Sequence, residues 1–223
     1  MRLMIYDNTD TKANLKDLRY LLPEDQNLLD IDEIDYEIPF GLTQEWTVGG
    51  KLYRALRWID KCKGFSSWDD ALAWIDSIGQ KETIEQIQVW GHGSPGKSWI
   101  GKQYLGFTAF EFEHSEVLKS IASNMTQDGV IWFRNCGVFS GKPGHRFAKA
   151  WANNMGCTIA AHTYIIGLWQ AGLNTCKPGE EPSWPLDEGI ALGTPSRPLK
   201  LKNSMPWSEK VGFVLRASIP GKG

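Results

Sequence analysis

The sequence predicts an α/β fold, a three-layer α/β/α sandwich around a mainly parallel sheet. Strand-like and helix-like stretches alternate between residues 84 and 161, and the strand at 130–133 is apolar on both faces, as in sheets that helices cover on each side. Right-handed crossovers join such strands. A chain of 223 residues can form one core. We therefore expect a single domain over residues 1–223, with an elaborated loop at about 164–198 that is rich in Gly, Pro and Trp.

The N-terminal part predicts a strand at residues 3–6, ended by the polar turn 7–10, and a short helical stretch at 15–22, stopped by Pro23. The acidic residues 30–37 are expected to form a surface connection. A helix should follow Ser67, because Ser67 and Asp70 have capping-box spacing and apolar residues repeat at helical intervals up to Ile78. Gly79 is expected to stop this helix.

The second half predicts three strands that end at candidate site residues. Residues 84–90 alternate as a strand and run into the glycine-rich turn 91–96, which places His92 at the strand end. Cys136 directly follows the apolar strand 130–133, and His162 ends the strand 158–161. The remaining expected elements are a helix within 109–125, a helix over 144–155 stopped by Gly156, and a last strand at 211–219.

Composition excludes several classes of protein. The net charge is −2 and basic residues form no regular stripe, so no nucleic-acid partner is indicated. The apolar N-terminal run is too short for a signal peptide, and no run approaches the ~20 residues that span a bilayer. We expect a soluble, cytoplasmic protein. The four cysteines lack CxxC spacing, so most should be free thiols.

Cys136 and His92 are the candidate catalytic pair. Carboxyl ends of neighbouring parallel strands meet at one edge of a sheet, which is where ligands collect. A thiol becomes a good nucleophile when a base lies within hydrogen-bond reach. The alternative is that Cys136 is a small buried residue and His92 a loop residue satisfied by backbone groups.

Two stretches resemble a known family. Residues 87–96 (IQVWGHGSPG), followed by Trp99-Ile100-Gly101, resemble the strand, His-Gly turn and glycine hairpin of caspase-like (clan CD) cysteine peptidases. Residues 130–144 (VIWFRNCGVFSGKPG) and 158–163 (TIAAHT) resemble the Cys strand and next strand of the bacterial caspase-like domain of large surface and adhesin proteins. The resemblance covers about residues 84–167. Asn135 and Gly137 differ from the eukaryotic caspase flanks.

The resemblance implies a cysteine endopeptidase that hydrolyses peptide or protein substrates and can process itself. Cys136 would be the nucleophile and His92 the general base and acid, with the backbone N–H groups of Gly93 and Cys136 as the oxyanion hole. No cofactor or metal is implied. In this fold class the substrate groove should lie between residues 94–101 and 162–169. Candidate substrate-binding residues are Ser94, Asn135, His162, Thr163 and Trp169.

Other interpretations of the same residues are weaker. Gly91, Gly93 and Gly96 spell the GxGxxG fingerprint, but Pro95 and the helix-poor residues 97–106 provide no helix N-terminus for a pyrophosphate. Ser94 lacks the small residue two positions earlier and the following helix that a serine-hydrolase elbow needs.

Two alternatives remain open. A zinc site of His92, Cys136 and His162 would use accepted ligand types. A non-catalytic binding module could also retain the fold, with the Trp-bearing loop as its recognition surface. The sequence determines neither the residue preferred at the cleaved bond nor the oligomeric state.

Overall fold

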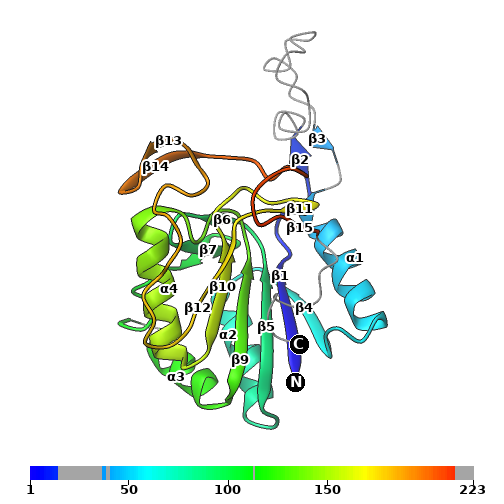
Figure 1. The fold of residues 1–223 in the computed structure, drawn as a ribbon. Helices are drawn as coiled ribbons and strands as arrows, with labels where there is room; N and C mark the ends of the chain where they lie inside the picture. Colours follow the sequence, from blue (N-terminus) through cyan, green and yellow to red (C-terminus); the bar gives the residue numbers. More distant parts are fainter. Residues whose placement is uncertain (15–36, 39–40, 113, 214–223) are drawn as a thin grey trace.

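A six-stranded sheet forms the centre of the protein. The computed structural model describes residues 1–14, 37–38, 41–112 and 114–213. Five of the six strands are parallel, and the sixth, an edge strand, is antiparallel to its neighbour. Their order across the sheet is β12 (Leu173–Cys176), β10 (Thr158–His162), β9 (Met125–Arg134), β5 (Ile84–Trp90), β1 (Arg2–Asp7) and β4 (Lys61–Phe65) (Figure 1). The predicted α/β class with a mainly parallel sheet is confirmed.

Helices cover both faces of the sheet. On β1, Leu3 and Ile5 pack into one large core, whereas Met4 between them belongs to a separate cluster on the other face. The large core involves α2 (Trp68–Gly79), α3 (Ser115–Ser123) and α4 (Gly141–Met155), and the smaller cluster involves α1 (Leu42–Ala55). Figure 1 shows α1 apart from the other three helices.

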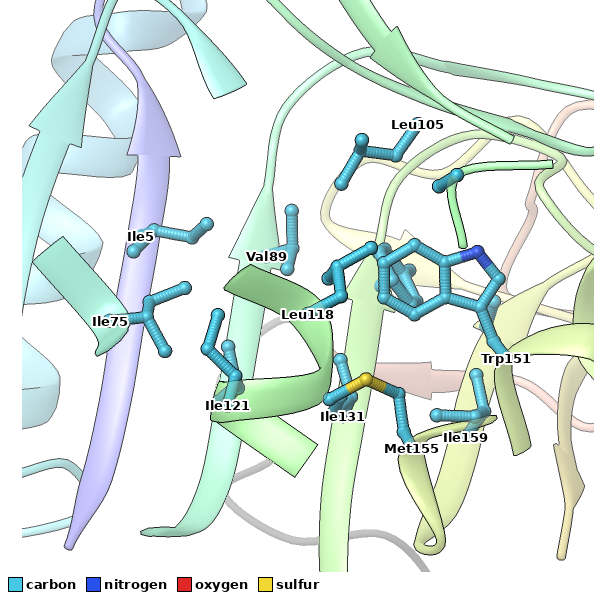
Figure 2. Close-up of a cluster of buried hydrophobic side chains, with 14 of the residues drawn as sticks. Ile5, Ile75, Val89, Leu105, Leu118, Ile121, Ile131, Trp151, Met155 and Ile159 are labelled. Carbon is cyan, nitrogen blue, oxygen red and sulfur yellow. The ribbon is translucent and has the colours of Figure 1, made fainter. Parts of the chain in front are cut away.

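The large core fixes the register of the strands. Side chains from three helices converge on the sheet, among them Leu118 from α3 and Trp151 and Met155 from α4 (Figure 2). The Phe133 ring of β9 lies edge-on to Trp151, with ring centroids 5.0 Å apart. Burying a large apolar side chain contributes roughly 1.5–3 kcal/mol, so a one-residue slip of β9 would be strongly unfavourable.

The predicted C-terminal stop is correct for α4 and wrong for α2, whose predicted start is correct. Ser67 Oγ accepts a hydrogen bond from Asp70 N at 3.2 Å and starts α2 as expected. Gly79, the expected stop, instead lies in the last turn of α2, which is capped at Gln80. A Cβ on Gly79 would lie 3.1 Å from Asn124 Cβ, so close packing accounts for this glycine. Gly156 ends α4 in the left-handed conformation, as predicted.

The region 164–198 is not a plain loop. It contains β12, which joins the sheet by pairing antiparallel with β10, and several short strands outside the sheet. Part of the expected last strand is present as β15 (Gly212–Phe213). Residues 214–219 lie outside the described part, as do 15–22 and 30–36. The short strands are β2 (Ala13–Asn14), β3 (Glu37–Ile38), β6 (Gly93–Ser94), β7 (Lys97–Ile100), β8 (Gln103–Leu105), β11 (Trp169–Gln170), β13 (Ile190–Thr194), β14 (Arg197–Leu201) and β15 (Gly212–Phe213).

Candidate functional site

His92 and Cys136 leave the sheet side by side. β5 and β9 pair in parallel with Trp90 opposite Arg134, and His92 and Cys136 each follow two residues later. Neighbouring strands are about 4.8 Å apart, so this register brings the two backbones together. The side chain of Asn135 ties them further, because its Nδ2 donates to the His92 carbonyl oxygen at 2.9 Å. The prediction that these two strands are neighbours is confirmed.

Gly93 lies directly against the backbone of Cys136. A Cβ at Gly93 would be 2.4 Å from Cys136 O and 2.9 Å from Cys136 N, which is a steric clash. Only glycine, which has no Cβ, fits at this position. Gly93 is the first residue of the β6–β7 hairpin and lies opposite Ser98. The pair before it, His92 and Trp99, is hydrogen-bonded, with Trp99 N donating to His92 O at 2.9 Å. Because bonded and non-bonded pairs alternate in an antiparallel ladder, the Gly93 N–H points away from β7.

The Cys136 thiol is half-buried and contacts the segment that follows β10. Its sulfur accepts a hydrogen bond from Ile166 N at 3.4 Å and donates to Ile166 O at 3.7 Å. Burial raises the pKa of the Cys136 thiol, and the Ile166 N–H opposes this shift in part. In the described part of the chain, the sulfur bonds to Ile166 and not to His92. A raised thiol pKa means that Cys136 needs a base to become a nucleophile.

The His92 ring pairs with a residue that the sequence did not single out. His92 Nε2 lies 3.0 Å from Asp10 Oδ2, and the edge of the Trp46 ring packs near the imidazole at 5.7 Å between centroids. The His92 side chain is 52% exposed and that of Asp10 is 20% exposed. Asp10 lies three residues after β1, and β1 is the neighbour of β5 in the sheet. A polar residue just beyond the strand next to that of His92 is the sequence signal that could have identified Asp10.

His162 and Thr163 do not fit the predicted contact with substrate. Both residues are fully buried, at 0% exposure. His162 Nδ1 donates to Ala171 O at 2.9 Å, and Nε2 accepts from Trp132 Nε1 at 3.3 Å, so both ring nitrogens are occupied. Because both ring nitrogens are occupied, His162 cannot serve as a ligand in the alternative zinc site. In the described residues, no group of three or more His, Cys, Asp or Glu side chains could hold a metal ion.

The burial of His162 predicts a pH-dependent stability. Burial lowers the pKa of His162 from 6.5 to about 3. Below pH 6.5 the unfolded chain takes up a proton that the folded protein excludes, so stability falls as the pH falls. The loss is about 1.4 kcal/mol per pH unit, or about 2 kcal/mol between pH 6.5 and 5. Urea unfolding should show this slope, and His162→Gln, which can still donate and accept, should reduce it. Equal slopes in the two proteins would contradict the prediction.

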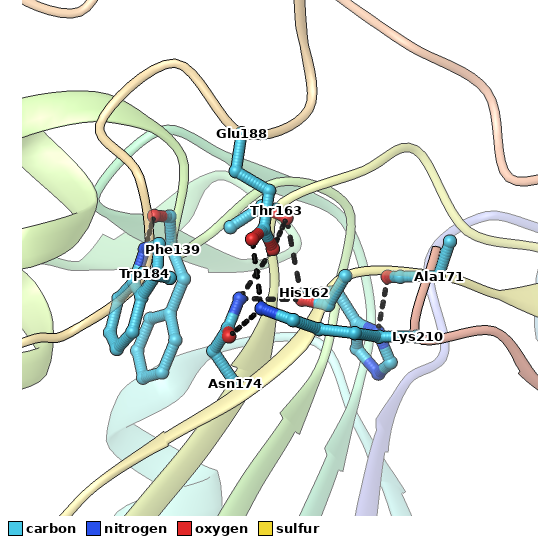
Figure 3. Close-up of polar contacts among 9 residues, drawn as sticks. Phe139, His162, Thr163, Ala171, Asn174, Trp184, Glu188 and Lys210 are labelled. Carbon is cyan, nitrogen blue, oxygen red and sulfur yellow. Dashed lines mark hydrogen bonds and ion pairs between the residues drawn. The ribbon is translucent and has the colours of Figure 1, made fainter. Parts of the chain in front are cut away.

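A buried carboxylate braces the end of β10. Glu188 accepts hydrogen bonds from Thr163 Oγ1 at 2.9 Å and Asn174 Nδ2 at 2.6 Å (Figure 3). Lys210 Nζ lies 2.9 Å from its second oxygen. The Glu188 side chain is 7% exposed. Through Glu188, Thr163 therefore connects the end of β10 to the distant segment around Lys210.

The other predicted residues lie at the same edge of the sheet with different surroundings. Ser94 is half-buried, and its Oγ accepts from Trp99 Nε1 at 3.2 Å. Asn135 is fully buried and holds the His92 carbonyl, so it positions the strand ends and does not face solvent. Trp169 is 38% exposed. The β6–β7 hairpin and the 162–169 segment both contact the residues that follow Cys136. Gly96 N of the hairpin donates to Val138 O, and Tyr164 O of the other segment accepts from Gly137 N.

A family model described as a domain of unknown function (DUF4347) matches residues 63–175, about half of the chain. The chain belongs to this family. No curated protein and no solved structure matches it. The DUF4347 segment contains His92, Cys136 and the strands that carry them. Asp10 and Trp46, which contact the His92 ring, lie before the DUF4347 segment.

All four cysteines are free thiols, as expected for most of them. Burial raises the pKa of Cys62 and of Cys176 to about 11. Within the described residues, no helix has both the length and the apolar character needed to cross a bilayer.

Proposed function

We propose that the protein is a cysteine peptidase of the caspase-like type, with Cys136 as nucleophile and His92 as general base. The observation that carries the proposal is the shared register of the two strand ends, which sets a histidine, a cysteine and a bare glycine backbone side by side. The mainly parallel sheet with helices on both faces is compatible with a caspase-like sandwich. Peptides or proteins are the substrates, and self-processing is included.

The reaction uses only groups of this chain and water. Cys136 Sγ attacks the peptide carbonyl carbon while its proton passes to His92, and the carbonyl oxygen becomes an oxyanion near the N–H groups of Gly93 and Cys136. His92 returns the proton to the leaving amine as the C–N bond breaks. Water then attacks the thioester, giving its proton to His92, and the acid product leaves as the thiol is restored.

The resting structure adds a requirement to this mechanism. Cys136 bonds to Ile166 at both the amide nitrogen and the carbonyl oxygen, so the segment around Ile166 must shift before a substrate carbonyl reaches the sulfur. Active-site hydrogen bonds are often long or misaligned without substrate. Residues 94–101 and 165–169 would then form the walls of the groove, with Trp169 exposed beside it.

A non-catalytic binding module is the second candidate. The bonds from Cys136 to Ile166, in place of one to His92, favour it. Exposed Leu168, Trp169 and Trp207, at 65%, 38% and 79%, would supply an apolar recognition surface.

Cleavage mapping separates the two candidates. The protein is incubated with a library of peptides from a digested proteome, and new N-termini are identified by mass spectrometry. We expect a recurring cleavage pattern with the wild type that is missing with Cys136→Ala. A folded wild type that produces no new termini, yet retains peptides from the library, would support the binding module and reject the peptidase.

A further inference from the structure

We infer that Asp10 is a positioning residue for His92, which makes the site a Cys–His–Asp arrangement; the inference rests on the proposed function. The distance of 3.0 Å from Asp10 Oδ2 to His92 Nε2 is that of a direct hydrogen bond. A carboxylate at neutral pH only accepts hydrogen bonds, so Nε2 must carry the proton. The neutral ring then has its lone pair on Nδ1, which leaves this nitrogen to accept the proton of Cys136.

The surroundings of Asp10 show how it is held in place. Its carbonyl oxygen accepts from Thr43 N at 3.0 Å, in the first turn of α1. A Cβ on Gly41 would be 2.2 Å from Asp10 O and 2.7 Å from Oδ1, so the start of α1 packs tightly against this residue. Asp10 is thus fixed by the N-terminus of α1 and not by a flexible turn alone.

The same helix also reaches the imidazole. Trp46, one turn into α1, places its ring edge-on to His92. Two independent contacts from residues before the DUF4347 segment therefore restrain one ring. The segment supplies the nucleophile and base, and the preceding residues supply the parts that orient the base.

The pair contributes little to folding, which makes its role testable. A pair in which His92 is half-exposed has a small effect on stability. Asp10→Asn is close in shape, so the melting temperature should not change. We expect kcat for a cleaved peptide to fall roughly 10- to 100-fold with KM unchanged, because the loss concerns the orientation of the base and not substrate binding. Asp10→Glu keeps the carboxylate and should restore part of the rate.

A double-mutant cycle shows whether Asp10 acts through His92. In the His92→Ala background, Asp10→Asn should have no further effect, whereas independent roles would add. The matched control is Asp60→Asn, which removes the carboxylate paired with Arg2 at the opposite end of β1. An undiminished kcat in Asp10→Asn, or an additive effect in the His92→Ala background, would overturn the inference.

A second readout does not require turnover. Nitrogen-15 spectra of the histidine rings, recorded where the rings are neutral, should show His92 protonated at Nε2 in the wild type, and its two nitrogen shifts should approach each other in Asp10→Asn. His162, whose Nδ1 donates to Ala171, is an internal reference for the opposite tautomer. His92 shifts that are identical in wild type, Asp10→Asn and Asp60→Asn would overturn the inference. Shifts that change as expected in a protein that cleaves nothing would reject the peptidase and leave the positioning role intact.

Discussion

Cys136→Ala is expected to abolish peptide hydrolysis while the protein remains folded. Without the sulfur no acyl-enzyme can form, and the remaining groups have no nucleophile to activate. The substitution removes one half-buried thiol whose hydrogen bonds go to Ile166, so thermal unfolding should change little. The measurement is the rate of appearance of new N-termini in a defined peptide substrate, together with the circular dichroism spectrum.

Cys62→Ala is the matched control for this change. Cys62 is also a half-buried free thiol, and burial raises its pKa to about 11. It lies on β4, away from any strand end that carries a histidine. Hydrolysis should continue in Cys62→Ala. If Cys136→Ala cleaved as fast as the wild type, Cys136 would not be the nucleophile.

His92→Ala should slow hydrolysis by ~10² to 10⁴ and leave the fold intact. Because burial raises the pKa of Cys136, little thiolate forms spontaneously at neutral pH, and the reaction depends on a base that removes the proton. The residual rate should therefore rise with pH as hydroxide takes over part of this task. Initial rates between pH 6 and 10 measure both effects.

The corresponding control is His114→Ala. His114 lies just before α3 and pairs with Asp69, which is not part of the proposed site, so its loss should not affect hydrolysis. Equal losses in His92→Ala and His114→Ala would indicate a general effect on folding. A wild-type rate in His92→Ala would exclude His92 as the base.

The central features of the site could be predicted because they depend on local patterns. The alternating pattern of β5 and the apolar run of β9 both end clearly, and parallel pairing of these strands then places His92 beside Cys136. Asp10 escaped notice because it is one of several polar residues in a turn, and only the position of α1 selects it.

The role of His162 could not be predicted for a different reason. It is the last residue of a buried strand, much as Cys136 lies just beyond one, but β12 pairs antiparallel along β10 and the ring bonds to the Ala171 carbonyl oxygen. That pairing depends on contacts with residues far along the chain, including the Glu188 brace with Lys210. Periodicity within a segment carries no information about such contacts.

The most direct test of a Cys136–His92 catalytic pair is labelling by a panel of peptidyl acyloxymethylketones, followed by intact mass measurement and peptide mapping. Such a pair predicts a single adduct on Cys136 in the wild type, much slower labelling in His92→Ala, and none in Cys136→Ala. Equal labelling of Cys62, Cys157 or Cys176 in the folded protein, or labelling of Cys136 at the same rate with and without His92, would contradict it.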